Sequence, residues 1–458
     1  MRHGSVMGRA ATSRVRGAHV IELRSIFSPL TLVVFLYMPL LLLYAVSSEN
    51  AFATEFDSRK TLSWTGFAFI ALALLCFAAG AKVGDDSARA RPLTRSAGAG
   101  EALTQAQRRS LAVLLEVALV VSIAAYVLWF ARGILRAGGI TALFETWRRD
   151  PEQVKGELLA TLPGVTTLTQ LAVAAIPLAI AFKLVRPGSA IRVLVVVVFA
   201  LAVVRTALFS ERLALIELLL PLAFLIAAPR KVTVPRIALY ALAFLLAVIT
   251  FFAATELRRS YAYTSDFSAS RATTRFFGYY LTSVNNGMAV VDEYPASTPF
   301  YWSGEFLWRL PVVGDLRVEH LPGIGTVNLR YADAFGIDPE SFWLRASAAQ
   351  GLDNEFNVFT APGYLAADFG WAALVAIFAL GLISGRLYAR TAASAFHRAL
   401  YGVWLVGLFE FMRILYFTNT RIFPAYLVFL AAYLVVRRRA PVGVPRPTPM
   451  TELPRATG

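Results

Sequence analysis

The sequence predicts an all-α polytopic membrane protein with about ten transmembrane helices and one large outer loop that bears short helices. Three observations support this fold class. The chain of 458 residues is 57% hydrophobic and only 16% charged, whereas a soluble domain carries about a quarter charged residues. Apolar runs long enough to cross a bilayer, which takes roughly 20 helical residues, recur along the chain. Lysine and arginine gather in alternate connecting segments, as the positive-inside rule describes.

Ten apolar runs make up the predicted spans, seven of them in residues 29–254 and three in residues 369–437. The first run, from Pro29 to Val46, has no small-residue cleavage site behind it, so we expect a retained helix and not a signal peptide. The ten runs are residues 29–46, 62–82, 111–131, 166–184, 190–208, 212–228, 237–254, 369–388, 399–418 and 421–436.

The distribution of charge predicts the orientation of these spans. The net charge is +15 at pH 7, and a basic excess occurs in every segment that falls on one side when the ten spans alternate. Because basic segments stay in the cytoplasm, we expect both termini there, with a basic N-terminal segment at 1–28 and a proline-rich tail at 438–458. In a membrane protein this charge reports topology, so we expect a lipid bilayer around the chain and no nucleic-acid partner.

The same topology leaves residues 255–368 outside as one long connection, and connections of this length are usually functional. The segment is dense in Tyr, Trp and Phe. Its stretch RATTRFFGYYLTSVNNGMAVV predicts a short helix that lies on or dips into the membrane interface, with aromatic side chains on the apolar side.

Arginines occur at the predicted outer ends of several helices, where arginine is normally sparse. In VVRTALFSERLALIELLLP, residues 203–221, the turn LFSER is expected to place Arg205 and Arg212 just below the outer headgroups. These side chains would either snorkel and anchor a helical hairpin or bind an anion, because a guanidinium group donates bidentately to phosphate and stays charged. TELRRSY and FEFMRILYFTNTRIF add Arg258, Arg259, Arg413 and Arg421. Together the six arginines predict a cationic basin at the outer face that would hold a diphosphate.

A proton acceptor at this face is harder to select. Any carboxylate buried beside an arginine could be tuned to accept a proton from a hydroxyl group. A lone histidine in a loop is more often solvated, and a glutamate three residues before an arginine on one helix face could simply pair with it. The sequence does not choose among the candidates, which are Glu256, Glu355, Asp368, Glu410 (three before Arg413) and His320.

The sequence contains no motif for nucleotide or metal chemistry. It lacks a P-loop, a GxGxxG after a strand, HExxH and CxxC. Its single cysteine, Cys76, lies in an apolar run, so neither an intrachain disulfide nor a zinc site is expected. We therefore expect no cofactor and no metal site.

Four stretches resemble motifs of the bacterial O-antigen polymerases, or oligosaccharide repeat-unit polymerases. SERLALIELLLP is similar to an arginine-bearing segment that opens a mid-chain span in that family, and TELRRSY is similar to the exit into its large periplasmic loop. RFFGYYLTSVNNG followed by PFYWSGEFLWRLPVVG resembles its loop helix and aromatic stretch. EFNVFTAPGYLAADFGWAALVAIFALGLISGRLYAR resembles its return into the membrane. The likeness covers residues 200–390 by motif and the whole chain by topology.

This resemblance implies a glycosyltransferase at the periplasmic face of the bacterial cytoplasmic (inner) membrane. An undecaprenyl-diphosphate-linked glycan would be the donor and a second lipid-linked repeat unit the acceptor, giving O-antigen, capsule or exopolysaccharide. Because the lipid diphosphate is the leaving group, the resemblance implies no nucleotide sugar and no obligatory metal. Arg212 matches the mid-chain arginine, and Arg258 or Arg259 matches the loop-entry arginine. A chain-length regulator and a flippase are the expected partners.

The resemblance also suggests roles for aromatic side chains, although aromatic residues are common at membrane interfaces for purely physical reasons. The candidates for stacking on the glycan are Tyr261, Tyr280, Trp302 and Trp308.

Three other functions stay open at this point. An O-antigen ligase would use a loop histidine, for which His320 is available. A glycosyltransferase that uses polyprenyl-phosphate sugars would need an acidic pair in the first outer loop, of which Glu55 and Asp57 are an echo. A flippase for lipid-linked glycans would need polar groups through the midplane and repeat symmetry.

Overall fold

The computed structural model describes residues 20–56, 58–90, 103–150, 153–160, 162, 164–209, 213–233, 269–309, 317–321, 325–328, 331–352 and 358–437. Within these residues the chain is predominantly helical, in agreement with the predicted all-α class. Five helical segments are long and apolar enough to cross a membrane. They are Pro29–Val46 (α1, η2 and α2), Trp64–Ala90 (α4), Gln105–Ala137 (α5), Ala190–Leu208 (within α10, Ala190–Phe209) and Ala361–Arg390 (α17, η5 and α18).

Four shorter apolar helical segments accompany them: Val165–Ala181 (α8 and α9), Leu213–Ala227 (α11), Ala395–Phe409 (α19) and Phe423–Arg437 (α20). Helix therefore occurs in each predicted span that the structure describes, whereas the predicted span at 237–254 lies outside the described residues. These helices indicate a membrane-embedded protein, while the number of ten spans stays a prediction. The other elements before residue 234 are β1 (Val20–Glu22), η1 (Leu23–Phe27), α3 (Glu49–Phe56), α6 (Ile140–Arg149), η3 (Val154–Leu158) and β2 (Lys231–Thr233).

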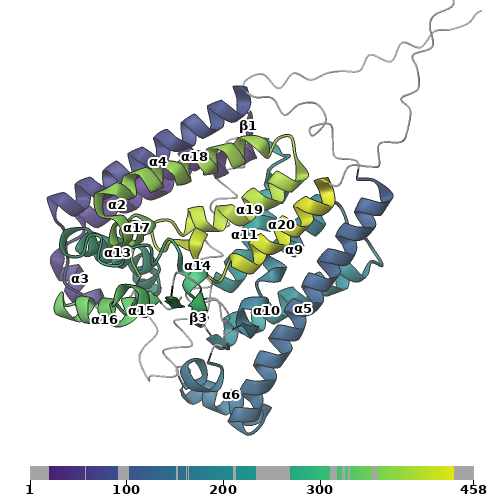
Figure 1. The fold of residues 1–458 in the computed structure, drawn as a ribbon, viewed down its shortest axis with the longest axis horizontal. Coiled ribbons are helices and arrows are strands. Elements are labelled where there is room, and N and C mark those ends of the chain that lie inside the picture. The colour runs from purple at the N-terminus through teal and green to yellow at the C-terminus, as the bar shows by residue number, and fades with distance from the viewer. Residues whose placement is uncertain are drawn as a thin grey trace, which may run out of the picture.

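Helices α4 and α18 lie side by side with their backbones in contact (Figure 1). Glycines make this approach possible. A Cβ atom at Gly80 would lie 2.1 Å from the carbonyl oxygen of Phe378, and one at Gly385 would lie 2.0 Å from the carbonyl oxygen of Ala81. In lipid, where burying apolar surface gives little driving force, such close backbone packing is a main source of helix association.

Helix α13 (Ala269–Glu293) corrects the short interfacial helix predicted for the same stretch. It is 25 residues long, its second half is buried, and it packs against α2, α4 and α17. Its polar side chains find partners inside the protein: Asn285 Oδ1 accepts a hydrogen bond from the Tyr44 hydroxyl over 2.8 Å and one from the Thr61 amide over 2.7 Å. Because these polar groups are satisfied internally, the helix can be buried despite its mixed composition.

The segments predicted to share the cytoplasmic side meet at one end of the bundle. Strand β1 pairs antiparallel with β2, joining the predicted N-terminal segment to the connection after α11. The Arg24 guanidinium group donates to the Thr391 hydroxyl over 3.4 Å, and the Gln107 side chain donates to the carbonyl of Val436 over 3.0 Å. This grouping agrees with the predicted alternation of the spans, and the compartment that it faces stays a prediction.

Short elements occupy the chain between α13 and α17, where the sequence predicts the large outer loop. They are α14 (Glu305–Trp308), β3 (Arg317–Leu321), β4 (Gly325–Asn328), α15 (Tyr331–Phe335) and α16 (Pro339–Ala349), followed by α17 (Ala361–Phe369), η5 (Gly370–Ala372) and α18 (Ala373–Arg390). Strands β3 and β4 form an antiparallel hairpin. Helices α13, α15 and α16 lie near the end of α4 and α18 that is away from β1 (Figure 1).

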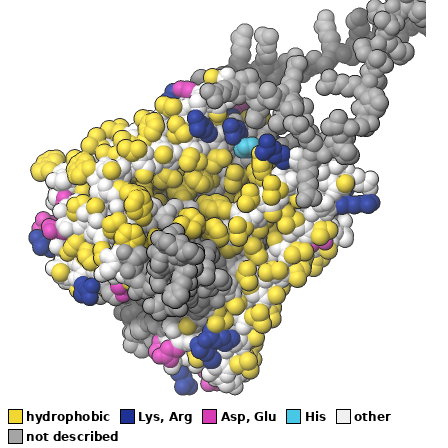
Figure 2. All heavy atoms as spheres, in the orientation of Figure 1, with side chains coloured by type: hydrophobic (Ala, Val, Ile, Leu, Met, Phe, Trp, Pro, Cys, Tyr) yellow, Lys and Arg dark blue, Asp and Glu magenta, His cyan; other side chains and the backbone are white. Residues whose placement is uncertain are grey.

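Hydrophobic side chains cover much of the face drawn in Figure 2, and charged side chains lie mainly near its margins. Several large apolar side chains are strongly exposed, including Phe35 at 76%, Trp64 at 89% and Val375 at 73%. A water-soluble protein rarely exposes apolar surface of this extent, so the surface suits a lipid environment.

Candidate functional site

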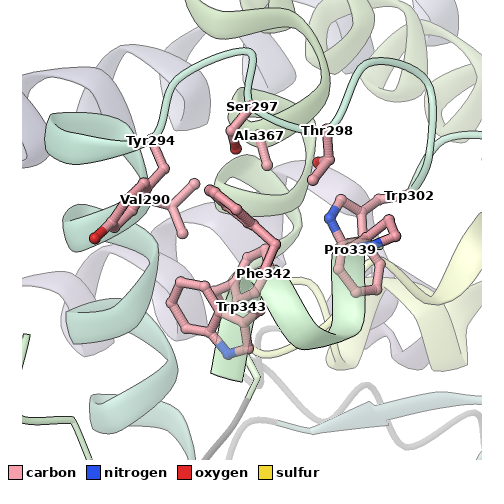
Figure 3. A pocket seen from close by; sticks show the side chains of 10 residues that line it. Val290, Tyr294, Ser297, Thr298, Trp302, Pro339, Phe342, Trp343 and Ala367 are labelled. Carbon is pink, nitrogen blue, oxygen red and sulfur yellow. The ribbon is translucent and has the colours of Figure 1, made fainter. Parts of the chain in front are cut away.

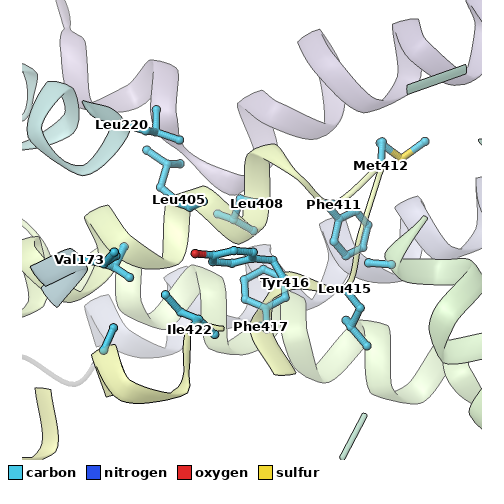
Figure 4. Packing of buried hydrophobic residues seen from close by; sticks show 14 of the residues in the cluster. Val173, Leu220, Leu405, Leu408, Phe411, Met412, Leu415, Tyr416, Phe417 and Ile422 are labelled. Atoms are coloured by element: carbon cyan, nitrogen blue, oxygen red, sulfur yellow. The ribbon is translucent and has the colours of Figure 1, made fainter. Parts of the chain in front are cut away.

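The connection between α19 and α20, residues 410–422, is buried and largely non-helical, which corrects the continuous helix predicted to residue 418. Its apolar side chains pack into the core, where the ring of Tyr416 lies near Val173, Leu405 and Ile422 (Figure 4). Connections normally run over the surface because buried backbone polar groups need partners. A buried connection therefore needs dedicated hydrogen bonds.

Polar contacts with other elements supply these hydrogen bonds. The carbonyl of Phe411 accepts from the amide of Ala361, at the start of α17. The Thr418 hydroxyl donates to the carbonyl of Trp302 over 2.8 Å. The Asn419 side chain accepts from the Arg421 amide over 2.9 Å. Leaving the helix at Phe409 thus lets the connection bond to α17 and to the segment before α14, contacts that a continued helix would not make.

A cavity of about 530 Å³ opens beside this connection. Its wall combines charged, polar and aromatic side chains from α14, α16, α17, the start of α11 and the α19–α20 connection. The charged, polar and aromatic residues in the wall are Arg309, Arg413, Arg421, Glu305, Asn419, Trp302, Trp343 and Tyr364. Two of the six predicted arginines and one of the four predicted aromatic residues therefore line the same cavity.

Arg413 is held against a buried carboxylate. Its Nη1 donates to Oε2 of Glu410 over 2.8 Å, and the Glu410 side chain is only 2% exposed. The guanidinium carbon lies 5.3 Å from the centre of the Tyr279 ring, within cation–π range. The Nε atom is buried and has no hydrogen-bond partner. The pair that the three-residue spacing allows is thus formed, and it holds Arg413 in the wall of the cavity.

Arg421 forms a second and deeper ion pair. It donates through Nε and Nη2 to the two carboxylate oxygens of Glu217 on α11, whose side chain is 1% exposed. The Tyr416 hydroxyl donates to Glu217 Oε1 over 2.7 Å. With its amide oriented to suit these neighbours, Gln170 donates to Glu217 Oε2 over 3.1 Å and accepts from Arg421. Glu217 is therefore fully hydrogen-bonded although it lies in an apolar helix.

Arg205 lies inside the bundle and does not line the cavity, which corrects its predicted place below the outer headgroups. It is 4% exposed and donates to the Thr169 hydroxyl over 3.1 Å. Its guanidinium carbon lies 4.9 Å from the centre of the Trp129 ring. Neither snorkelling nor contact with a headgroup describes this arginine, because it faces aromatic rings in the protein interior.

Glu305 is a cavity carboxylate that the sequence analysis did not select. Its side chain is 7% exposed and lies 3.5 Å from Nε of Arg309, one helical turn later. The Asn419 amide nitrogen lies 3.3 and 3.2 Å from its two carboxylate oxygens. The i,i+4 spacing of an acid and an arginine within YWSGEFLWRLP was a signal that could have identified it.

Asp368, a candidate base, instead holds the segment that leads to α14. Its carboxylate accepts hydrogen bonds from the amides of Trp302 over 3.1 Å and Ser303 over 2.6 Å, and from the Thr298 hydroxyl over 3.4 Å. It does not line the cavity. Its position therefore supports the placement of Trp302, whose ring does line the cavity.

The remaining aromatic candidates do not line the cavity. Tyr280 is half-buried on α13. The indole nitrogen of Trp308 donates to the carbonyl of Phe300, and its ring packs against Tyr331 and Phe335. These contacts make Trp308 part of a small aromatic cluster under α15.

The side chains of seven predicted site residues lie outside the described part of the structure. Arg212, Glu256, Arg258, Arg259 and Tyr261 lie outside the described residues, as does Glu355. His320 belongs to β3, but its side chain is likewise outside the described part.

A second hollow, of about 10 Å³, lies between α13, α16 and α17 (Figure 3). The rings of Tyr294, Phe342 and Trp343 line it, and it has room for one water molecule at most. It is a packing gap and not a ligand site. Among the residues that the structure describes, no group of three His, Cys, Asp or Glu side chains is arranged to hold a metal ion.

Each arginine of the cavity thus has a carboxylate partner: Arg309 with Glu305, Arg413 with Glu410 and Arg421 with Glu217. The predicted basin of arginines is, in the described part of the chain, a set of ion pairs around a cavity. Comparison of the chain with protein-family models, with curated proteins and with solved structures found no match.

Proposed function

We propose that this protein is a membrane-embedded glycosyltransferase that polymerises undecaprenyl-diphosphate-linked oligosaccharide repeat units into a surface polysaccharide. The reaction would take place at the periplasmic face of the bacterial inner membrane. The observation that carries the proposal is the cavity beside the α19–α20 connection, whose wall holds three arginines, a buried carboxylate and two indole rings. The resemblance of short motifs to the O-antigen polymerases supplies the substrate class.

The arginines suit a diphosphate leaving group. A departing lipid diphosphate gathers negative charge, and guanidinium groups held in fixed positions stabilise such charge most strongly where water is partly excluded. Arg413 is fixed by Glu410 and by the Tyr279 ring, and its Nε donor is unused. The carboxylate partners therefore orient the guanidinium groups before substrate arrives.

Additional positive charge would come from the chain next to the cavity. Leu213 lines the cavity, and Arg212 precedes it in the sequence. The proposal assigns Arg212, with Arg258 or Arg259, to the diphosphate together with Arg413. These residues would give the site the net positive charge that the described ion pairs lack.

The indole rings suit the glycan. Aromatic side chains present flat apolar faces to which the C–H faces of sugar rings bind, and ligand sites commonly combine such faces with a few polar groups. Trp302 and Trp343 occupy the cavity wall together with Glu305 and Asn419. We assign this side of the cavity to the sugars nearest the reacting bond.

The test is deletion of the gene in its native host, followed by sizing of the surface polysaccharide and analysis of its lipid carrier. A polymerase predicts single repeat units on the final acceptor, restored to long chains by the wild-type gene. Accumulation of full-length polymer on undecaprenyl diphosphate would instead identify a ligase. Accumulation of repeat units on the cytoplasmic side would identify a flippase, and loss of a single sugar from the repeat unit would identify a transferase that uses polyprenyl-phosphate sugars.

A further inference from the structure

Resting on the proposed function, we infer that Glu305 is the catalytic base that accepts the proton of the acceptor hydroxyl group. Glu305 is the acidic residue in the wall of the 530 Å³ cavity, which it shares with Arg413, Arg421 and the indole rings. Its side chain is 7% exposed, so it is largely shielded from solvent and faces the cavity.

The neighbours of Glu305 hold it in place. The Arg309 guanidinium group lies 3.5 Å from the carboxylate. The Asn419 amide nitrogen lies 3.2 Å from one carboxylate oxygen and 3.3 Å from the other, which fixes the plane of the group.

The position of Glu305 is also fixed through its backbone. The Thr420 hydroxyl donates to its carbonyl over 3.1 Å, so the α19–α20 connection that carries Arg413 and Arg421 also holds α14 in place. The proposed base is thereby bonded to the same connection that carries Arg413, one of the proposed diphosphate ligands. A general base has to be held within hydrogen-bond reach of its proton, and this arrangement provides that placement.

The three other buried carboxylates among the described residues are less suited to the role. Glu410 pairs with Arg413, and Glu217 is engaged by Arg421 and Tyr416. Asp368 accepts from two backbone amides and a hydroxyl group. None of these three lines the cavity, so an acceptor bound there would not reach them.

The proposed step transfers the donor glycan from its lipid diphosphate to the acceptor hydroxyl group. The acceptor hydroxyl oxygen forms a bond to C1 of the donor sugar while the bond from C1 to the diphosphate oxygen breaks. The electron pair of the broken bond leaves with the lipid diphosphate, and the hydroxyl proton moves to Glu305. Glu305 then releases this proton to water after the products depart. No oxidant, reductant or further co-reactant is required.

The experiment uses the full-length protein in lipid nanodiscs, with lipid-linked repeat units isolated from the host deletion strain. The rate of glycosidic bond formation at saturating substrate is measured across pH for the wild type, for Glu305→Gln and for Glu305→Asp. Binding of the lipid-linked donor is measured separately. Glu293→Gln is the matched control, because Glu293 is an exposed carboxylate at the end of α13.

We expect Glu305→Gln to lower the rate by about a hundredfold to ten-thousandfold, the usual contribution of a general base, with donor binding retained. The wild-type rate should fall as pH drops and the base becomes protonated, which gives the plot of rate against pH an acidic limb. This acidic limb should be absent from the residual rate of Glu305→Gln. Glu305→Asp should recover part of the rate with its acidic limb restored, and Glu293→Gln should behave as the wild type.

A Glu305→Gln variant with the wild-type rate, or with an unchanged acidic limb, would place the base elsewhere. Loss of donor binding in Glu305→Gln and Glu305→Asp alike would overturn the inference in favour of a purely structural role. Both results differ from failure of the proposed function itself, in which the wild-type protein forms no polymer from the same substrates.

Discussion

Arg421 donates to both carboxylate oxygens of Glu217, and this ion pair ties the α19–α20 connection to the first half of α11. Glu217 lies in an otherwise apolar helix, and its carboxylate is almost fully buried. Transfer of such charges out of water is costly, so the pair stabilises the fold only because it is bidentate and because Tyr416 satisfies the same carboxylate. The pair fixes one wall of the cavity.

Removing one member of this pair should destabilise the protein strongly. We expect Glu217→Ala to lower the free energy of unfolding by about 3–5 kcal/mol, because it leaves the Arg421 charge buried without its partner. The double variant Glu217→Ala/Arg421→Met should be more stable than Glu217→Ala alone, since the Arg421 charge is removed together with its partner. Thermal unfolding of the purified proteins in detergent measures both effects. A double variant less stable than Glu217→Ala would contradict this interpretation.

The proposed diphosphate site predicts that removing the Arg413 side chain strongly lowers the polymerisation rate. Removing one guanidinium group from a developing anion should cost about 3 kcal/mol, or roughly a hundredfold in polymerisation rate. The variant to test is Arg413→Ala, measured by single-turnover bond formation at matched protein levels. Arg345→Ala is the control, because Arg345 is exposed on α16 and does not line the cavity. Equal rates for both variants would remove Arg413 from the diphosphate site.

The contribution of Arg212 to polymer length should depend on the shape of its guanidinium group as well as on its charge. Arg212→Ala should shorten the polymer to single or few repeat units, and Arg212→Lys should restore its length only in part, since lysine lacks the bidentate fork. Electrophoretic sizing of the surface polysaccharide in the complemented deletion strain provides the measurement. Arg390→Ala serves as control, because Arg390 is exposed at the end of α18 near Thr391 and Arg24. Polymer of normal length from Arg212→Ala would exclude this role.

The contact between α4 and α18 predicts a position at which adding a single methyl group destabilises the protein. Gly385→Ala would place its Cβ atom 2.0 Å from the carbonyl oxygen of Ala81, so the two helices would have to separate. Overpacking of this kind costs about 1–3 kcal/mol, and backbone contact puts this site at the upper end. Gly156→Ala is the matched control, because no atom lies within 4 Å of the added Cβ. Comparable midpoints of thermal unfolding for the two variants would show that the helices are not in such close contact.

The predicted orientation of the spans can be tested with single cysteines. In a Cys76→Ala background, Arg345→Cys should react with a membrane-impermeant thiol reagent added to whole cells with a permeable outer membrane, and Arg390→Cys should react only after the inner membrane is broken. Both native side chains are exposed, so the reagent can reach them. The opposite labelling pattern would invert the topology and move the proposed site to the cytoplasmic face.

The sequence by itself predicted the all-α membrane class, the presence of helix in each apolar run that the structure describes, and the grouping of the basic segments at one end. These features follow from composition and from local periodicity, because a helix long and apolar enough to enter a membrane needs no information from distant residues. The pairing of Glu410 with Arg413 was likewise accessible, since residues three apart share a helix face.

Only the tertiary structure decided which charges meet and which face the cavity. Arg421 and Glu217 are 204 residues apart in the chain, and Asn419 and Glu305 are 114 apart. Arg205 faces Trp129 instead of the headgroups, and α13 is buried, because neighbouring helices offer partners that the local sequence does not reveal. A charge in an apolar helix must find a partner somewhere, since leaving it alone in the membrane interior is costly. That requirement predicts that partners exist, whereas the packing of the helices determines which residues they are.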